Sequence, residues 1–153
     1  MNDKDWKETL TAMDRNRAFI ESWSEAEPEP AAARCEFSRH RTLAHLRAAQ
    51  EFYLEAVLAF AERDNPSVTV LHAWRRFTLN GYEVLPWRTH LEAYQKDRTT
   101  WEQLVRNPSL DRSRGGRFNR NERTIESMTQ GLVTHEQAHF EALLAREAMP
   151  KRG

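Results

Sequence analysis

The 153-residue chain has one cysteine and no net charge, and each of these shortages excludes a class of protein. The single cysteine, Cys35, rules out an internal disulfide and a zinc cluster held by several thiolates. The 23 Lys and Arg residues balance 23 Asp and Glu residues, so the chain lacks the positive excess that attracts nucleic acid or an anionic membrane surface. The mean hydropathy is −0.83, and no apolar run approaches the roughly 20 residues that a membrane-spanning helix needs. These two features exclude a membrane span.

The N-terminal sequence MNDKDWKETL also lacks the apolar core of a secretion signal, which predicts a cytoplasmic protein. A length of 153 residues fits a single domain over residues 1–153. Aromatic residues make up 10% of the chain, which is enough to build a hydrophobic core despite the high charge content.

Helical periodicity dominates what remains. Apolar residues recur at three- and four-residue steps in four segments, which the sequence places at about 3–24, 38–62, 86–105 and 119–149. Proline-containing breaks follow the first three: Glu27–Pro30, Asp64–Pro66 and Asn107–Pro108. The last helix is expected to begin near Asn119 or Asn121, and Asn119 with Glu122 resembles a capping box. The pattern predicts an all-α protein built as a four-helix bundle.

Two connections differ from short turns. The segment 63–84 is long, contains the turn signal Asn80-Gly81, and includes the only short strand candidate, Val68–Leu71. A connection of this length lets the second and third helices run parallel. The Gly- and Arg-rich segment 109–121 (SLDRSRGGRFNRN) is predicted to be a mobile, solvated loop, and no role is assigned to its arginines.

The sharpest chemical feature is the pair His135 and His139 in the last helix. Residues four apart share one helix face, and neutral imidazoles at this spacing can bind one divalent ion. The register places both in the apolar stripe Ile125, Met128, Leu132, His135, His139, Leu143. Two polar rings facing a core need partners, and a shared metal supplies one to both. The alternatives are hydrogen-bonded core histidines or a stripe rotated toward solvent.

A third ligand is expected at His45, which lies beside the apolar stripe of segment 38–62. Its alternative is a histidine bonded to a carbonyl at the edge of the core. His40 is predicted to be solvated or capping and His90 to lie at the surface, while His72 is left open. Three neutral imidazoles leave a divalent cation with an open position, where it would activate a thiol or a water.

Two competing motifs involve Glu136. The string His135-Glu136-x-x-His139 matches a metalloprotease motif in which the glutamate is the general base. Only 14 residues follow His139, and they hold no suitably placed third ligand. A di-iron bundle needs a second Glu-x-x-His motif, which the second helix lacks. Glu136 is one residue beyond His135 and therefore off the helix face that the two histidines share, so it is predicted to be solvated.

The segments 41–51 (RTLAHLRAAQE) and 131–140 (GLVTHEQAHF) together resemble the second-helix and last-helix motifs of the DinB/YfiT-like superfamily of metalloenzymes. The order of the motifs and the spacing between His45 and His135 are also similar, and the likeness extends from about residue 6 to residue 147. One position departs from the pattern, because Gln50, followed by Glu51, occupies a place that is often acidic in the family.

The resemblance implies an up-down-down-up bundle and a homodimer. It implies a site of His45, His135 and His139 that holds zinc or nickel, or else iron or manganese. Relatives in this superfamily act on low-molecular-weight thiols as S-transferases or a thiol-dependent isomerase, and some are linked to hydrolysis. We therefore expect a thiol S-transferase with a small-molecule substrate. The alternatives are a metal-dependent hydrolase of the same fold and a non-enzymatic, dimeric stress-response protein that binds metal.

Overall fold

Four long helices contain most of the backbone in the computed structural model, which describes residues 1–23 and 29–150. They are α1 (Asp3–Glu21), α2 (Arg39–Glu62), α4 (Trp87–Val105) and α5 (Ile125–Glu147). The shorter helices are η1 (Pro30–Arg34), α3 (Ala73–Leu79) and η2 (Tyr82–Val84), and the strands are β1 (Ser67–Val68), β2 (Gly115–Phe118) and β3 (Asn121–Thr124). The chain is mostly helical as expected, with a small sheet that the all-α prediction did not include.

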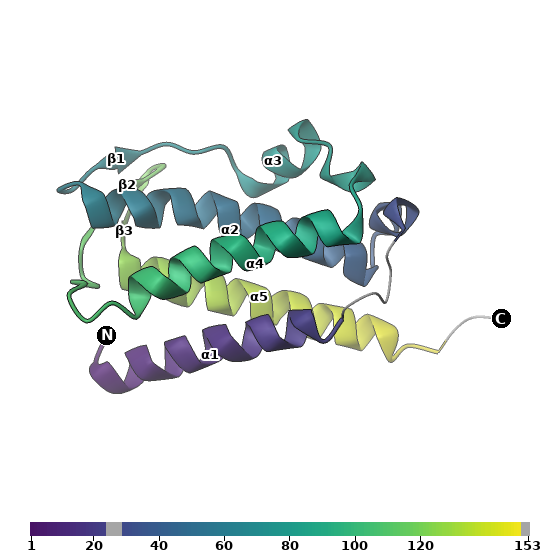
Figure 1. Cartoon of the computed structure of the whole chain (residues 1–153), viewed down its shortest axis with the longest axis horizontal. Coiled ribbons are helices and arrows are strands. Elements are labelled where there is room, and N and C mark those ends of the chain that lie inside the picture. Colours follow the sequence, from purple (N-terminus) through teal and green to yellow (C-terminus); the bar gives the residue numbers. More distant parts are fainter. Residues whose placement is uncertain (24–28, 151–153) are drawn as a thin grey trace.

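The long helices lie side by side with α2 in contact with both α4 and α5, and α1 packs against α5 (Figure 1). In that view α1 and α5 run from left to right, whereas α2 and α4 run from right to left. Because α2 and α4 run the same way, the chain between them returns along the length of the molecule. This return segment carries β1, α3 and η2, and α3 packs on α2.

The long helices α1 and α2 each begin after a residue whose side chain caps the helix. Asn2 accepts a hydrogen bond from the Asp5 backbone N–H, and Ser38 accepts one from Arg41. At the other end, α1 finishes at Glu21; its expected end at about residue 24, and the first residues of the Glu27–Pro30 break, lie outside the described residues.

The start of α5 differs from the prediction. Thr124 and Ser127 form the capping box, so the helix begins at Ile125 rather than near Asn119. Asn119 has a φ of 54°, the left-handed conformation of a tight turn rather than the extended conformation of an N-cap. Its side chain instead accepts a hydrogen bond from the Val70 N–H at 3.0 Å.

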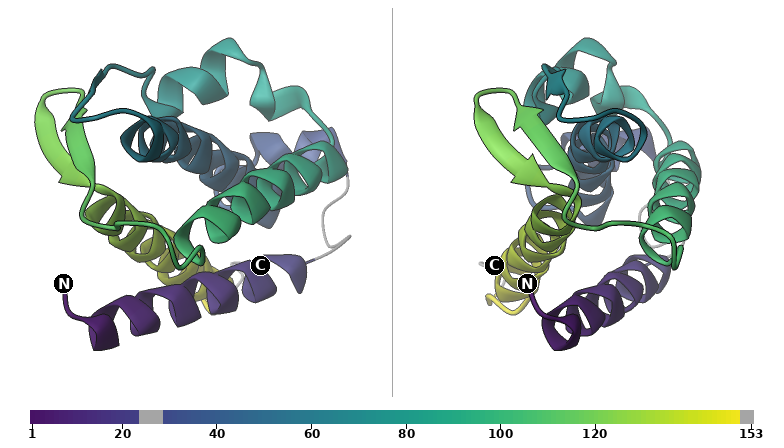
Figure 2. Two further views of the ribbon diagram at one scale, coloured as in Figure 1. Left: turned by 60° about the vertical axis from the view of Figure 1, so that its left-hand side comes forward. Right: turned by 90° about the vertical axis from the view of Figure 1, so that its left-hand side faces the viewer.

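The segment predicted to be a mobile loop forms a β-hairpin. β2 pairs antiparallel with β3, and β1 pairs parallel with β2 through Ser67 opposite Arg117. Figure 2 shows the hairpin at the end of the molecule where α2 finishes and α5 begins. A Cβ atom on Gly116 would lie 2.2 Å from the Pro66 carbonyl oxygen, so the close approach of β2 to this turn requires a glycine.

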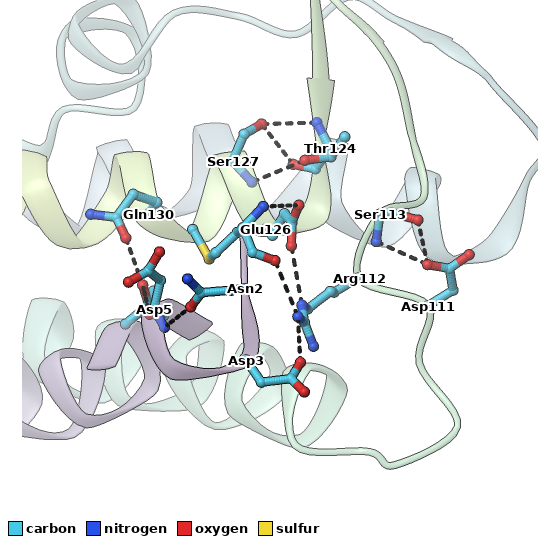
Figure 3. A network of polar contacts seen from close by, with 12 residues as sticks. Asn2, Asp3, Asp5, Asp111, Arg112, Ser113, Thr124, Glu126, Ser127 and Gln130 are labelled. Atoms are coloured by element: carbon cyan, nitrogen blue, oxygen red, sulfur yellow. Dashed lines mark hydrogen bonds and ion pairs between the residues drawn. The ribbon is translucent and has the colours of Figure 1, made fainter. Parts of the chain in front are cut away.

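Two arginines of this segment have structural contacts rather than solvated ends. Arg112 pairs with Asp3 at 2.8 Å and with Glu126 at 3.1 Å, which joins the N-terminus of α1 to the first turn of α5 (Figure 3). Arg114 donates hydrogen bonds to the carbonyl oxygens of Phe60 and Arg63, both at 2.9 Å. The arginines therefore fasten the hairpin to the helix ends.

The hydrophobic core follows the length of the helices. Toward the hairpin it contains Trp6, Met13, Phe60, Trp101 and Leu132, and toward the other end Ile20, Trp23, Leu43, Trp87 and Phe140. Within the described residues, no helix has the length and apolar character that crossing a membrane requires.

Candidate functional site

His135 and His139 meet on α5 as their spacing predicts. Their Nε2 atoms face each other at 3.2 Å, and the ring centroids are 4.6 Å apart. Both side chains are half-buried, so the pair is open to solvent on one side. The i and i+4 positions bring the rings together because the intervening turn of helix stacks one side chain above the other.

The pair lies at the edge of the buried face of α5 rather than at its centre. The buried residues of the helix are Ile125, Met128, Thr129, Leu132, Val133, Glu136, Phe140 and Leu143. This face is rotated from the predicted stripe toward Glu136. The rotation explains how two histidines remain accessible on a helix that is otherwise packed into the core.

His45 lies on α2 and is also half-buried, but its ring packs elsewhere. It is stacked on Phe77 of α3 with 4.1 Å between ring centroids and 8° between the planes. Arg41, one turn earlier on α2, lies over the same Phe77 ring at 5.0 Å. The pKa of His45 is lowered to about 4, mainly by burial, with smaller contributions from the positive charge of Arg41 and from His139 and His135.

The structure therefore brings two of the three predicted ligands together. In residues 1–23 and 29–150, no group of three or more His, Cys, Asp or Glu side chains is arranged to hold a metal ion. His45 faces the same cavity as His139, but the ring stacks on Phe77 instead of joining the pair. Face-to-face contact with an aromatic ring stabilises that orientation because both apolar faces are removed from water.

The geometry of the pair fits two ligands of one divalent cation. Two metal–nitrogen bonds of about 2.1 Å place their nitrogens roughly 3.0–3.4 Å apart at angles between a right angle and the tetrahedral value. The observed 3.2 Å lies in that range. Burial lowers the pKa of both histidines, which favours the neutral rings that metals bind. The same distance also suits a hydrogen bond between two neutral imidazoles.

The other ring nitrogen of His135, Nδ1, is buried and has no hydrogen-bond partner among the described residues. A hydrogen bond between the two Nε2 atoms leaves that Nδ1 unsatisfied. The His135 ring thus has one buried nitrogen that no described protein group hydrogen-bonds.

A cavity of about 520 Å³ opens beside His45 and His139. Its walls include the apolar side chains of Phe37, Leu143 and Met149, and the charged residues Glu36, Arg41 and Arg146 also line it. This volume lies in the range of pockets that bind small organic molecules. This cavity was not predicted from the sequence, since its walls come from the start of α2, the end of α5 and the segment before α2.

Glu136 is fully buried, which corrects the prediction that it is solvated. Its carboxylate pairs with the buried guanidinium of Arg98, accepts a hydrogen bond from the Tyr94 hydroxyl at 2.7 Å, and accepts another from Asn16 at 3.2 Å. Arg98 also donates to Gln50 at 2.7 Å. Because these groups occupy the carboxylate inside the core, Glu136 is not available as the general base of a metalloprotease motif.

The sequence contained a signal for this network. Arg98 falls between Tyr94 and Trp101 at helical steps of four and three, in the middle of the apolar stripe of α4. A charged residue in such a stripe needs a buried partner of opposite charge. Gln50, at the position that is often acidic in the resembled family, belongs to the same network and donates to the Tyr94 carbonyl at 2.9 Å.

Two further histidines are buried, contrary to the prediction of solvent exposure. The Nε2 atom of His40 lies 3.0 Å from the Leu85 carbonyl oxygen, and Nε2 of His90 lies 2.9 Å from that of Tyr82. Arg47 donates to Nδ1 of His90 at 3.2 Å. Both rings are thus bonded to the end of the return segment. His72 is exposed and accepts a hydrogen bond from the Trp74 N–H at the start of α3.

Comparison with protein-family models, with curated proteins and with solved structures finds no significant match for this chain.

Proposed function

We propose that this chain is a DinB-like, metal-dependent enzyme that holds one divalent cation through His45, His135 and His139. The cation is zinc or nickel, with iron or manganese as alternatives. The observation that best supports this proposal is that the Nε2 atoms of His135 and His139 face each other at 3.2 Å on a half-buried face of α5. A divalent cation bound there would act as a Lewis acid that lowers the pKa of a thiol or a water.

The position of His45 supports its assignment as the third ligand. Its ring lines the same cavity as His139, and its pKa responds to both histidines of α5. Completing the site requires the ring to leave Phe77 and turn toward the pair. His45 sits on a long helix that packs directly against α5, so a side-chain rotation is the movement that the proposal needs.

The arrangement of the helices supports the resemblance. We assign the fold to an up-down-down-up four-helix bundle, since α1 and α5 run opposite to α2 and α4 in Figure 1. The small sheet and α3 would then be additions within two of the connections. A homodimer in the cytoplasm remains the predicted state of the protein.

The burial of Glu136 favours the thiol S-transferase over the hydrolase. A hydrolase of the His-Glu-x-x-His type needs a carboxylate beside the metal to take a proton from water, and Glu136 is occupied by Arg98, Tyr94 and Asn16. A thiol has a much lower pKa than water and becomes a nucleophile when its proton is lost beside a cation. The proposed reaction is the transfer of a small thiol to an electrophilic substrate.

The first test is metal analysis of the purified chain and of two histidine variants. We expect close to one equivalent of metal in the parent and in His72→Ala, and loss of metal in His135→Ala with unchanged helical circular dichroism. His72 is the matched control, because it is an exposed histidine outside the proposed ligand set. Equal metal in parent and His135→Ala would contradict the ligand assignment.

The second test distinguishes the reactions. Chelator-treated and zinc- or nickel-reloaded protein is assayed with 1-chloro-2,4-dinitrobenzene and a thiol (bacillithiol, mycothiol or glutathione), and separately with p-nitrophenyl acetate. Metal-dependent consumption of the aryl chloride supports the transferase, and metal-dependent ester cleavage alone supports the hydrolase. Bound metal with neither activity would support the non-enzymatic alternative.

A further inference from the structure

The cavity beside the histidines has walls of two different kinds. Phe37 and Met149 are large apolar side chains with 48% and 60% of their surfaces exposed, although both line the cavity. Leu143 forms a buried part of the wall, and Ala142 and Ala145 add small apolar surfaces. Apolar side chains left this exposed around a hollow are typical of a ligand-binding surface.

The charged residues of the cavity are mostly positive. Arg41 and Arg146 line it together with one carboxylate, Glu36. Arg41 donates to the Ala33 carbonyl at 3.3 Å and lies 3.9 Å from the carboxylate of Glu83. Two arginines and one carboxylate give the side chains that line the cavity a net positive charge.

Of the two arginines that line the cavity, Arg146 is the one without a nearby carboxylate among the described residues. Its guanidinium lies over the Phe37 ring at 3.9 Å, and no carboxylate of residues 1–23 or 29–150 lies within ion-pair distance of it. The neighbouring carboxylate, Glu147, forms a bidentate pair with Arg39 instead. A guanidinium stacked on an aromatic ring keeps its edge N–H groups free to donate to an anion.

We propose that this cavity binds an organic anion with an apolar body, whose acidic head group is bound by Arg146 and Arg41 and whose body lies against Phe37, Leu143 and Met149. A neutral apolar molecule would leave the guanidinium of Arg146 without an anionic partner, and an organic cation would be repelled by the two arginines. The assignment of this ligand class as the substrate depends on the proposed function, since the same cavity contains His45 and His139.

The test uses the full-length chain after removal of metal by chelation, so that a carboxylate cannot bind through a cation. The fluorescent probe 1-anilinonaphthalene-8-sulfonate, itself an apolar anion, is bound to the folded protein and displaced by octanoate, octan-1-ol or octylammonium. These competitors share a chain and differ in the charge of the head group. We expect octanoate to displace the probe at about tenfold lower concentration than octanol, and octylammonium not to displace it.

Three variants locate the binding. Arg146→Gln is expected to weaken octanoate about tenfold without changing octanol, because it removes one charge-assisted hydrogen bond. Arg39→Gln is the matched control and is expected to match the parent, since that charge already pairs with Glu147. Ala142→Phe places a ring in the cavity from an exposed position on α5 and is expected to abolish displaceable binding.

Equal displacement by octanol and octanoate, an unchanged octanoate affinity in Arg146→Gln, or unimpaired binding in Ala142→Phe would each overturn the proposal. These outcomes are separate from those of the metal test. Binding of octanoate to the metal-free chain persists even if no cation binds the histidines, whereas normal metal binding without any preference for octanoate would refute only the ligand class.

Discussion

Arg98 and Glu136 form an ion pair whose two side chains have no exposed surface. Glu136→Gln keeps the size of the side chain but leaves a buried guanidinium without a counter-charge. We expect the free energy of unfolding to fall by about 3–5 kcal/mol, because removal of one member of a buried pair leaves an uncompensated charge in the core. Urea denaturation followed by circular dichroism measures this change.

The control for that variant is the exposed pair Arg39–Glu147, with side chains 30% and 35% exposed. Arg39→Gln is expected to change the free energy of unfolding by less than about 1 kcal/mol, since solvent screens such pairs. A Glu136→Gln variant as stable as Arg39→Gln would show that the core tolerates the unpaired arginine and that the network does not stabilise the fold.

His90 makes stability depend on pH. Burial is the main cause that lowers its pKa from 6.5 to about 4, and the positive charge of Arg47 contributes, while the hydrogen bond to the Tyr82 carbonyl opposes the shift. A group with a depressed folded-state pKa binds more protons when unfolded, so its contribution is complete above pH 6.5 and is lost as the pH falls toward 4. We expect the parent to lose stability over this interval.

The contribution of His90 is isolated by His90→Gln, which removes the titrating ring. Urea denaturation at several pH values between 7 and 4 is expected to give a smaller loss of stability for the variant than for the parent. The other five histidines are unchanged in the variant, so the comparison reports the loss of the His90 ring. Identical pH dependence in the two proteins would be inconsistent with a buried, neutral His90.

Single residues were predicted correctly where local spacing decides their position. The pairing of His135 with His139 follows from their i and i+4 positions. His40, His90 and Glu136 were predicted wrongly as exposed. Their partners Leu85, Tyr82 and Arg98 belong to other elements of the fold. Helical periodicity carries no information about such contacts.

Substitution by alanine is expected to have opposite effects on stability at two glycines, Gly131 and Gly116. Gly131 lies within α5, and a Cβ there would have no atom within 4 Å beyond its own helix and chain neighbours, whereas a Cβ on Gly116 would meet the Pro66 carbonyl at 2.2 Å. Gly131→Ala is expected to raise the free energy of unfolding by about 0.5–1 kcal/mol through helix propensity. Gly116→Ala is expected to lower it by about 1–3 kcal/mol because β2 must move away from the turn.

Thermal and urea denaturation of the two glycine variants measure both effects. A stabilised Gly116→Ala would mean that the hairpin does not press against the turn at Pro66. A destabilised Gly131→Ala would mean that α5 meets a neighbour at that position, contrary to the open space that the structure shows.

The elements themselves were predictable to different degrees. The four long helices were identified because each repeats apolar residues over at least five turns, and their bounds agree within a few residues except at the start of α5. The hairpin was missed because its strands, GGRF and NERT, do not alternate apolar and polar residues. Its stability comes from Arg112 and Arg114 binding distant acceptors and from two glycines that allow close approach.

The proposed metal site would couple metal binding to the stability of the whole fold, because its ligands would come from both α2 and α5. Saturating zinc, at about a hundred times its dissociation constant, is expected to stabilise the fold by about 2.7 kcal/mol and to raise the melting temperature by about 5–10 °C. The increase should vanish in His139→Ala and persist in His72→Ala. Equal increases in both variants would indicate that zinc binds elsewhere.

The three-histidine site is tested most directly by calorimetric titration of zinc into the metal-free chain. The same titration is made with the variants His45→Ala, His135→Ala, His139→Ala and His72→Ala. We predict one site per chain in the parent and in His72→Ala. We predict an affinity reduced more than about a hundredfold in each of the other three, because each would lose a direct ligand. Parent-like binding by His45→Ala, or by either variant of the α5 pair, would contradict the proposal that these three imidazoles share one cation.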